Sequence, residues 1–144
     1  MMIRPDIGKV APEFTTLDEN GNKVALKDFR GKIVVLYFYP KAMTPGCTTQ
    51  ACALRDHKKE LDKLNAVALG ISPDAPKRLL KFKERDALNF TLLSDEDHGI
   101  ADKYGVWGLK KFMGREYDGI HRTTFIINEK GKLVNIMDKF KTKT

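Results

Sequence analysis

The chain has two cysteines, and both lie in one short segment, PKAMTPGCTTQACALRD, at residues 40–56. Cys47 and Cys52 are five residues apart, and the pair could bind a metal, form a structural disulfide, or act as a reactive thiol with its partner. Zinc needs at least three protein ligands. The three histidines show no metal-ligand spacing and lie at His57, His98 and His121. We therefore expect no metal and no cofactor, which leaves thiol chemistry or two buried structural cysteines.

Cys47 lies where a helix is predicted to begin. Thr44 is a favoured N-cap residue and Pro45 suits the first helical position, so Cys47 falls in the first turn. Backbone N–H groups in that turn have no partners, and the helix dipole favours negative charge there. A thiol at this position should therefore ionise more easily than a free one. Gly46 has no side chain, so a small substrate can approach these backbone donors.

Cys52 cannot reach Cys47 while this helix is intact. Five helical residues turn by about 140° and rise by about 7.5 Å, which separates the two Cα atoms by about 8.7 Å, whereas a disulfide needs less than about 7 Å. The apolar face of the predicted helix holds Ala51, Leu54, Leu61 and Leu64. Cys47 lies on that face and Cys52 points nearly opposite. If the pair bonds, the first turns must unwind, which the β-branched Thr48 and Thr49 favour.

The remaining sequence alternates strands with helices, which predicts one α/β domain over residues 1–144. A hairpin is expected around Asn20-Gly21, because this dipeptide separates two short alternating segments. The run Ile33–Tyr39 is apolar throughout, as in a strand buried on both faces. Further strands are expected at residues 66–72, 90–95 and 121–137, the last segment forming two strands around a turn.

Three helices and one long loop complete this prediction. The helices are expected at Thr44–Leu64, from Asp74 as N-cap to Arg85, and from a capping box of Ser94 and Asp97 to Tyr104. The segment GVWGLKKFMGREYDG, residues 105–119, is expected to be a loop. Its apolar side chains either form a wall near the site or anchor the loop, and they are Trp107, Phe112, Met113 and Tyr117.

Charge and hydropathy exclude several classes of protein. The chain has 26 Lys and Arg against 19 Asp and Glu, a net charge of +7, but its basic residues are scattered among acids. This pattern favours a solvated surface over nucleic-acid binding. The N-terminus carries no signal-peptide apolar run, and Ile33–Tyr39 is too short to span a bilayer. We therefore expect a cytoplasmic protein without membrane partners, in which free thiols stay reduced.

With these residues in place, the segment YFYPKAMTPGCTTQACALRD resembles the active-site segment of the peroxiredoxins. It carries their P-x-x-x-T-x-x-C pattern as Pro40, Thr44 and Cys47. With a second cysteine at Cys52, the segment resembles that of the Q-type, or bacterioferritin comigratory protein, branch. Other similar segments follow in order along the chain and include GKVAPEFTTLDENGNKVALKDFRGK, LGISPDAPKRLLKF and FMGREYDGIHRTTFIINEKGK. The chain departs from the family at its last residues, KFKTKT, where members usually continue into a final helix. We therefore expect part of one sheet face to be less covered.

The resemblance implies a thioredoxin-like fold, with a mixed central β-sheet flanked by helices and an N-terminal β-hairpin extension. It also implies a thiol peroxidase for hydroperoxides that acts as a monomer and takes electrons from thioredoxin, with glutaredoxin as a second candidate. Cys47 would be the peroxidatic cysteine and Cys52 the resolving one, joined in an intramolecular disulfide. Pro40 would shield the site from water, Thr44 would hydrogen-bond the substrate oxygens, and Arg122 would pair with the thiolate.

Other interpretations of the same residues stay open at this point. From the sequence alone, Arg122 fits a surface ion pair, Thr44 a simple helix cap and Pro40 a strand stop. His121 fits a strand-edge residue better than a proton carrier. A disulfide oxidoreductase acting on proteins is the alternative enzyme, although C-x-x-x-x-C is not the C-x-x-C spacing of such sites. A basic module that binds nucleic acid is the alternative outside enzymes.

Overall fold

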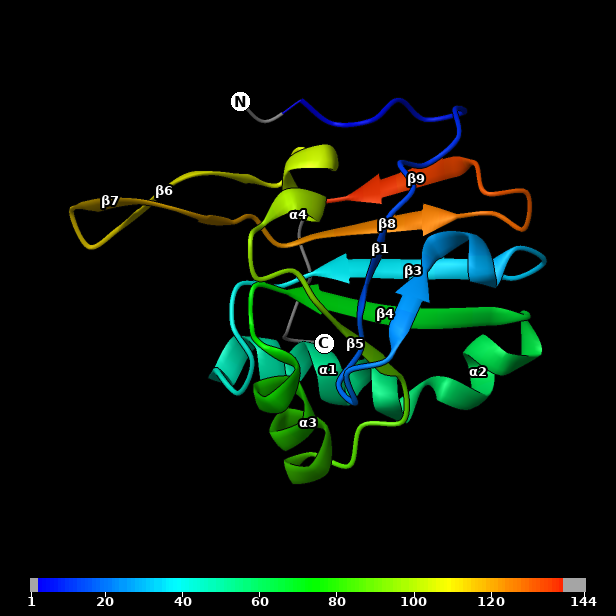
Figure 1. Ribbon diagram of the computed structural model, residues 1–144, viewed down its shortest axis with the longest axis horizontal. Helices are drawn as coiled ribbons and strands as arrows, with labels where there is room; N and C mark the ends of the chain where they lie inside the picture. The colour runs from blue at the N-terminus through cyan, green and yellow to red at the C-terminus, as the bar shows by residue number, and fades with distance from the viewer. Residues whose placement is uncertain (1–2, 139–144) are drawn as a thin grey trace.

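The computed structural model describes residues 3–138 of the chain. A five-stranded sheet forms its centre, with the strand order β5-β4-β3-β8-β9 (Figure 1). Its strands are β3 (Ile33–Phe38), β4 (Ala66–Ser72), β5 (Thr91–Ser94), β8 (Thr123–Ile127) and β9 (Leu133–Met137). The first three are parallel to one another, and β8 and β9 are antiparallel to their neighbours. The predicted mixed sheet is therefore confirmed.

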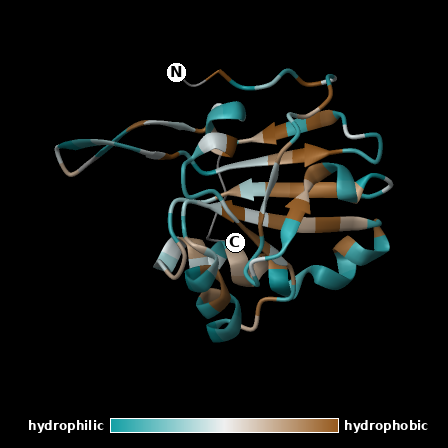
Figure 2. Ribbon diagram, in the orientation of Figure 1, coloured by the Kyte–Doolittle hydropathy of each residue, from teal (hydrophilic) through white to brown (hydrophobic). Residues whose placement is uncertain are grey.

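Strand β3 lies at the centre of the sheet and is buried on both faces. Leu36 and Phe38 point into one core cluster, and Tyr37 and the following Tyr39 point into a second cluster on the opposite face. This alternation follows from the two-residue period of a strand. Figure 2 shows the same pattern, since the central strands are mostly apolar and polar residues lie on the helices around them.

The helices cover the two faces of the sheet unequally. The second cluster packs α1 (Pro45–Asp56), α2 (Lys58–Lys63) and α3 (Pro76–Arg85) on one face (Figure 1). The first cluster packs the short α4 (Gly99–Lys103) and the 3-10 helix η1 (Leu26–Phe29) on the other. The helix expected over Thr44–Leu64 is in fact two helices, because the backbone leaves the helical conformation at His57, with φ −101° and ψ 14°.

Two hairpins lie outside the central sheet. The predicted one is confirmed as β1 (Thr15–Leu17) and β2 (Lys23–Ala25), with Gly21 in the left-handed region at its turn. The segment expected to be a long loop is instead a second hairpin, β6 (Trp107–Phe112) and β7 (Arg115–Ile120), which projects from the body in Figure 1. Met113 and Gly114 both have positive φ, 51° and 79°, which is the geometry of a tight two-residue turn.

Two predicted helix caps are wrong, because their side chains bind elsewhere. Helix α3 has Ala75 as its N-cap, not Asp74. Helix α4 begins at Gly99. The Asp95 carboxylate accepts hydrogen bonds from two backbone N–H groups in the first turn of this helix, at 3.0 and 2.9 Å. The Ser94 hydroxyl donates instead to the carbonyl of Asp74, at 2.7 Å. The segment KFKTKT, on which the expectation about a final helix rests, lies outside the described residues.

Candidate active site

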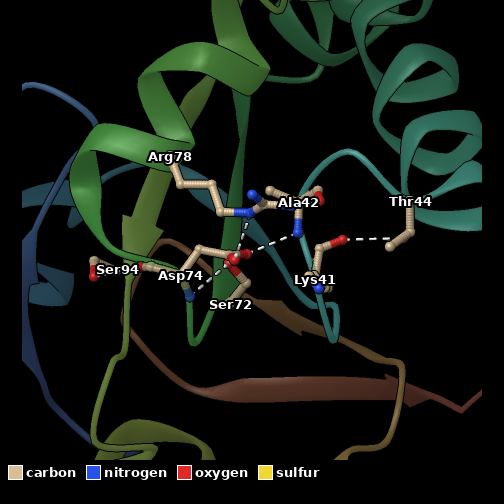
Figure 3. Close-up of polar contacts among 7 residues, drawn as sticks. All are labelled: Lys41, Ala42, Thr44, Ser72, Asp74, Arg78 and Ser94. Atoms are coloured by element: carbon tan, nitrogen blue, oxygen red, sulfur yellow. Dashed lines mark hydrogen bonds and ion pairs between the residues drawn. The ribbon is translucent and has the colours of Figure 1, made fainter.

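The first turn of α1 carries the candidate nucleophile. Helix α1 begins at Pro45 after the extended residue Thr44 (φ −83°, ψ 154°), so Cys47 is the third helical residue, as predicted. Thr44 is the N-cap residue, as predicted, but its hydroxyl makes no capping hydrogen bond and donates instead to the carbonyl of Lys41 at 3.0 Å (Figure 3). The hydrogen of that hydroxyl is therefore engaged, and its oxygen is left as an acceptor.

The two cysteines lie on different sides of an intact helix. Cys47 is 1% exposed and packs with Ala51 in the second core cluster, whereas Cys52 is partly exposed. Both thiols are free, and every residue between them is helical. This arrangement agrees with the prediction that the pair can bond only after the first turns of α1 unwind.

Arg122 lies against the start of α1, although it is far away in the sequence. It immediately precedes β8, whose first residue, Thr123, pairs with Phe38 at the end of β3. That pairing brings Arg122 to the edge of the sheet from which α1 departs. A Cβ atom at Gly46 would lie 2.8 Å from Nη2 of Arg122 and 3.4 Å from its Cζ. Gly46 therefore makes room for the guanidinium at the positive end of the helix.

A polar network centred on Asp74 holds the loop before α1 (Figure 3). The Asp74 carboxylate accepts hydrogen bonds from the Ala42 N–H at 2.7 Å and the Ser72 hydroxyl at 2.8 Å. It also pairs with Nε of Arg78 at 3.2 Å, and Nη2 of Arg78 donates to the Ala42 carbonyl at 3.2 Å. Both backbone groups of Ala42 are therefore fixed, next to Met43, which has a positive φ of 65°. The network therefore stabilises a backbone conformation that residues other than glycine rarely adopt.

Lys110, on β6, adds a second positive charge beside Arg122. Its Nζ donates to the carbonyl of Ile120 at 2.8 Å, and its stem passes Gly119, where a Cβ would lie 3.3 Å away from Lys110 Cδ. Burial lowers the pKa of Lys110, and the charge of Arg122 lowers that pKa further, while Cys47 opposes both effects. Lys110 and Arg122 thus place two positive charges in this part of the site.

Lys110 also lines two cavities, one with Pro40 in its wall and the other with Arg122. One, of about 280 Å³, includes Pro40, Pro73, Trp107, Tyr117 and Ile120 in its wall. The other, of about 360 Å³, is lined by Arg4, His121, Arg122 and Asp138. The first is mainly apolar and the second is rich in cations, so the region can receive a molecule with both an apolar and a polar part.

Tyr37, on β3, and Tyr39, just after this strand, lie in the same core cluster as Cys47. The rings of Tyr37 and Tyr39 stack with their centroids 5.3 Å apart. Burial raises the pKa of Tyr37 well above its usual value, and burial also raises the pKa of Tyr39. Both hydroxyls therefore stay neutral, and neither adds a negative charge that would oppose a thiolate at Cys47.

The remaining side chains considered from the sequence have different positions. Trp107 and Tyr117 lie in the cavity wall with Pro40, and Trp107 also stacks on His98 with centroids 4.0 Å apart, whereas Met113 is exposed at the tip of its hairpin. The His121 ring faces the Leu109 carbonyl at 3.0 Å. Within residues 3–138 no cluster of three or more His, Cys, Asp or Glu side chains could hold a metal ion. No helix in this range could cross a membrane.

Sequence reasoning missed three residues of this region, namely Asp74, Arg78 and Lys110. A signal for the first two was present, because their i, i+4 spacing follows a strand that is parallel to β3. Strand ends that meet at one edge of a sheet bring such side chains to the same site. Lys110 had no comparable signal, since its position depends on a hairpin that was expected to be a loop.

The fold and this site define a class of protein: a thiol-based oxidoreductase, whose candidate nucleophile is a cysteine at a helix N-terminus next to an arginine. Residues 7–136 match the AhpC/TSA family, and the chain belongs to this family. It is 64% identical over 137 residues to a Bcp protein of Haemophilus influenzae, with 95% of this chain and 88% of that protein covered. Peroxiredoxin Bcp of Escherichia coli is 56% identical over 135 residues, with 94% and 86% covered.

Solved structures support the same assignment. The bacterioferritin comigratory protein of Xanthomonas campestris, studied for alkyl peroxide reduction, is 30% identical, with a TM-score of 0.87 over 95% of this chain and 90% of that one. Peroxidoxin BcpB of Mycobacterium tuberculosis is 34% identical, with a TM-score of 0.83 over 94% and 88%. The expected thioredoxin-like fold is thereby confirmed. The chain is a peroxidase, an oxidoreductase that acts on peroxides with a thiol reductant.

Proposed function

We propose that Cys47 is the peroxidatic cysteine and that this chain reduces hydrogen peroxide and organic hydroperoxides. The observation that supports this most directly is the position of Cys47 in the first turn of α1, with the Arg122 guanidinium against Gly46. Backbone N–H groups and a permanent cation there stabilise negative charge on sulfur and on the oxygen that leaves. Among the cysteines, Cys47 alone combines this position with a neighbouring arginine.

In the first step, the Cys47 thiolate attacks the terminal oxygen of the hydroperoxide. A sulfur–oxygen bond forms as the oxygen–oxygen bond breaks, so sulfur is oxidised to a sulfenic acid and the peroxide is reduced. The leaving oxygen takes up the proton that the thiol released and departs as an alcohol, or as water when the substrate is hydrogen peroxide. The Thr44 oxygen accepts a hydrogen bond from the O–H group of the substrate, and Arg122 stabilises the negative charge as it moves from sulfur to oxygen. Pro40, in the wall of the apolar cavity, shields the site from water.

In the second step, the Cys52 thiol attacks the sulfenic sulfur of Cys47. A disulfide forms, the sulfur–oxygen bond breaks, and the hydroxyl leaves as water with the thiol proton. The helix between the two residues must unwind first, because an intact helix separates their Cα atoms by about 8.7 Å. Thioredoxin then reduces the disulfide by dithiol exchange and returns both cysteines to thiols.

The test is peroxide consumption coupled to thioredoxin, thioredoxin reductase and NADPH. Cys47→Ser should abolish turnover. Cys52→Ser should consume one equivalent of peroxide per chain and accumulate a sulfenic acid at Cys47, measured by mass spectrometry after dimedone trapping. Normal turnover by the Cys47→Ser variant would refute the assignment of the nucleophile, and normal thioredoxin-coupled turnover by Cys52→Ser would refute the intramolecular disulfide. Replacing thioredoxin with glutaredoxin in the same assay tests the choice of reductant.

A further inference from the structure

Helix α3 holds the active-site segment at two separate points, through arginines at its two ends. Arg78 and Arg85 are seven residues apart, about two turns, and so lie on the same side of the helix. Arg78 binds the carbonyl of Ala42, before Cys47 (Figure 3). Nη2 of Arg85 donates to the Thr48 hydroxyl at 2.8 Å, directly after Cys47. The second contact links α3 to the part of α1 between the two cysteines.

The Arg85 side chain is held in place for this contact. Its Nε and Nη2 bind the carboxylate of Asp86, at 3.0 and 2.8 Å, and its guanidinium lies 5.8 Å from the centroid of the Phe82 ring. These contacts restrict the guanidinium, so that less conformational entropy is lost when it binds Thr48. The bond to Thr48 is therefore part of an ordered arrangement at the C-terminal end of α3.

The last turn of α1 is fixed to the same region independently. Nη1 of Arg55 donates to the Asp86 carbonyl at 2.5 Å, and the Asn89 side chain donates to the Arg55 carbonyl at 3.2 Å. Arg55 follows Cys52, so these bonds can persist when residues 45–52 unwind. The Arg85–Thr48 bond cannot persist in the same way, because Thr48 lies inside the segment that must change conformation.

We propose that Arg85 is a positioning residue for the second step of the reaction and acts through Thr48. By holding Thr48, it stabilises the helical form of α1, in which the thiolate is poised for peroxide, and it slows the unwinding that lets Cys52 reach Cys47. This inference rests on the proposed intramolecular disulfide. The two arginines therefore have different roles. Arg78 holds the loop that is needed for attack on peroxide, and Arg85 controls the rate of disulfide formation.

The expected effect is moderate, because Arg85 is about half exposed and burial of Cys47, Gln50 and Ala51 also opposes unwinding. Loss of an exposed charged hydrogen bond of this kind corresponds to about a two- to fivefold change in the equilibrium between helical and unwound forms. Disulfide formation should become faster by that factor. At high peroxide, the fraction of Cys47 oxidised further to sulfinic acid should fall by a similar factor, because Cys52 captures the sulfenic acid sooner.

The experiment compares Arg85→Met, Thr48→Val and the double variant with the wild-type chain. Arg85→Met keeps the apolar stem over Phe82, and Thr48→Val keeps the β-branched shape, so each removes one end of the same bond. Stopped-flow fluorescence of Trp107 and quenched mass spectrometry separate sulfenic acid formation from disulfide formation. Lys81→Met is the matched control, since it removes a charge from the exposed side of the same helix.

Support would be faster disulfide formation in both single variants, no further gain in the double variant, less sulfinic acid, and an unchanged rate of sulfenic acid formation. A disulfide rate equal to or below that of the wild type in Arg85→Met and Thr48→Val would overturn the inference, as would fully additive effects. If the wild type forms a sulfenic acid but no disulfide, the proposed second step fails, and this inference fails with it. Two variants on different helices ensure that misfolding of one leaves the other to decide.

Discussion

Gly46→Ala should separate the stability of this chain from its activity. Gly46 lies in the first turn of α1 and has no positive φ, so alanine fits its backbone. Alanine is preferred over glycine within helices by about 0.5–1 kcal/mol. Its neighbour is the far end of the flexible Arg122 side chain, which can move at little cost. The free energy of unfolding should therefore stay the same or rise by up to about 1 kcal/mol.

The same substitution should damage the reaction, because the new Cβ occupies the place of the guanidinium. The contact would be 2.8 Å to Nη2 of Arg122, so the guanidinium must retreat by about 0.6 Å or more to reach an ordinary contact distance. A catalytic group misplaced by about 1 Å can cost a factor of about 100 in rate. We expect the second-order rate constant of Cys47 oxidation by peroxide to fall by about 10- to 100-fold.

The assay measures that rate constant by stopped-flow fluorescence of Trp107, and stability by urea unfolding followed by circular dichroism. A double-mutant cycle with Arg122→Met isolates the cause, because Gly46→Ala should cost nothing more once the guanidinium is gone. Two results would refute the reasoning: a wild-type rate in Gly46→Ala, or an equally large loss in the Arg122→Met background. A loss of rate that follows a loss of stability would refute it as well.

Three further substitutions test other parts of the structure. Asp74→Asn should lower the free energy of unfolding by about 1–3 kcal/mol and slow Cys47 oxidation at least about tenfold, because the Ala42 N–H loses its charged acceptor; unchanged urea unfolding and rate would contradict this. Gly70→Ala should destabilise the chain by about 1–3 kcal/mol, since a Cβ there would lie 2.8 Å from the Tyr37 ring, and an unchanged urea midpoint would argue against that packing. Burial raises the pKa of Asp95, so the folded protein binds this proton more tightly than the unfolded chain does, and stability contributed by Asp95 falls as pH rises above about 4. The unfolding free energy of Asp95→Asn should therefore rise more steeply with pH just above pH 4 than that of the wild type, and identical slopes would speak against it.

Local patterns of the sequence indicated the position of the candidate nucleophile and the centre of the sheet. Thr44 and Pro45 predicted the start of α1, which places Cys47 in its first turn, and the structure has the helix beginning at Pro45. The uniformly apolar Ile33–Tyr39 predicted a strand buried on both faces, which is β3. Such features are readable because the preference of proline for the first helical position is local, and the hydrophobic period of an element is independent of its partners.

Tertiary structure alone decided which distant groups complete the site. Arg122 lies against Gly46, 76 residues earlier, only because β8 pairs with β3 in one register. Asp74 is typical of a helix cap, yet its carboxylate binds Ala42, since a partner supplied by the loop outcompeted the local cap. Lys110 reaches the site from a hairpin whose second strand, β7, is largely exposed and shows little alternation. In each case the deciding free energy comes from a contact between remote segments, which a pattern of neighbouring residues does not encode.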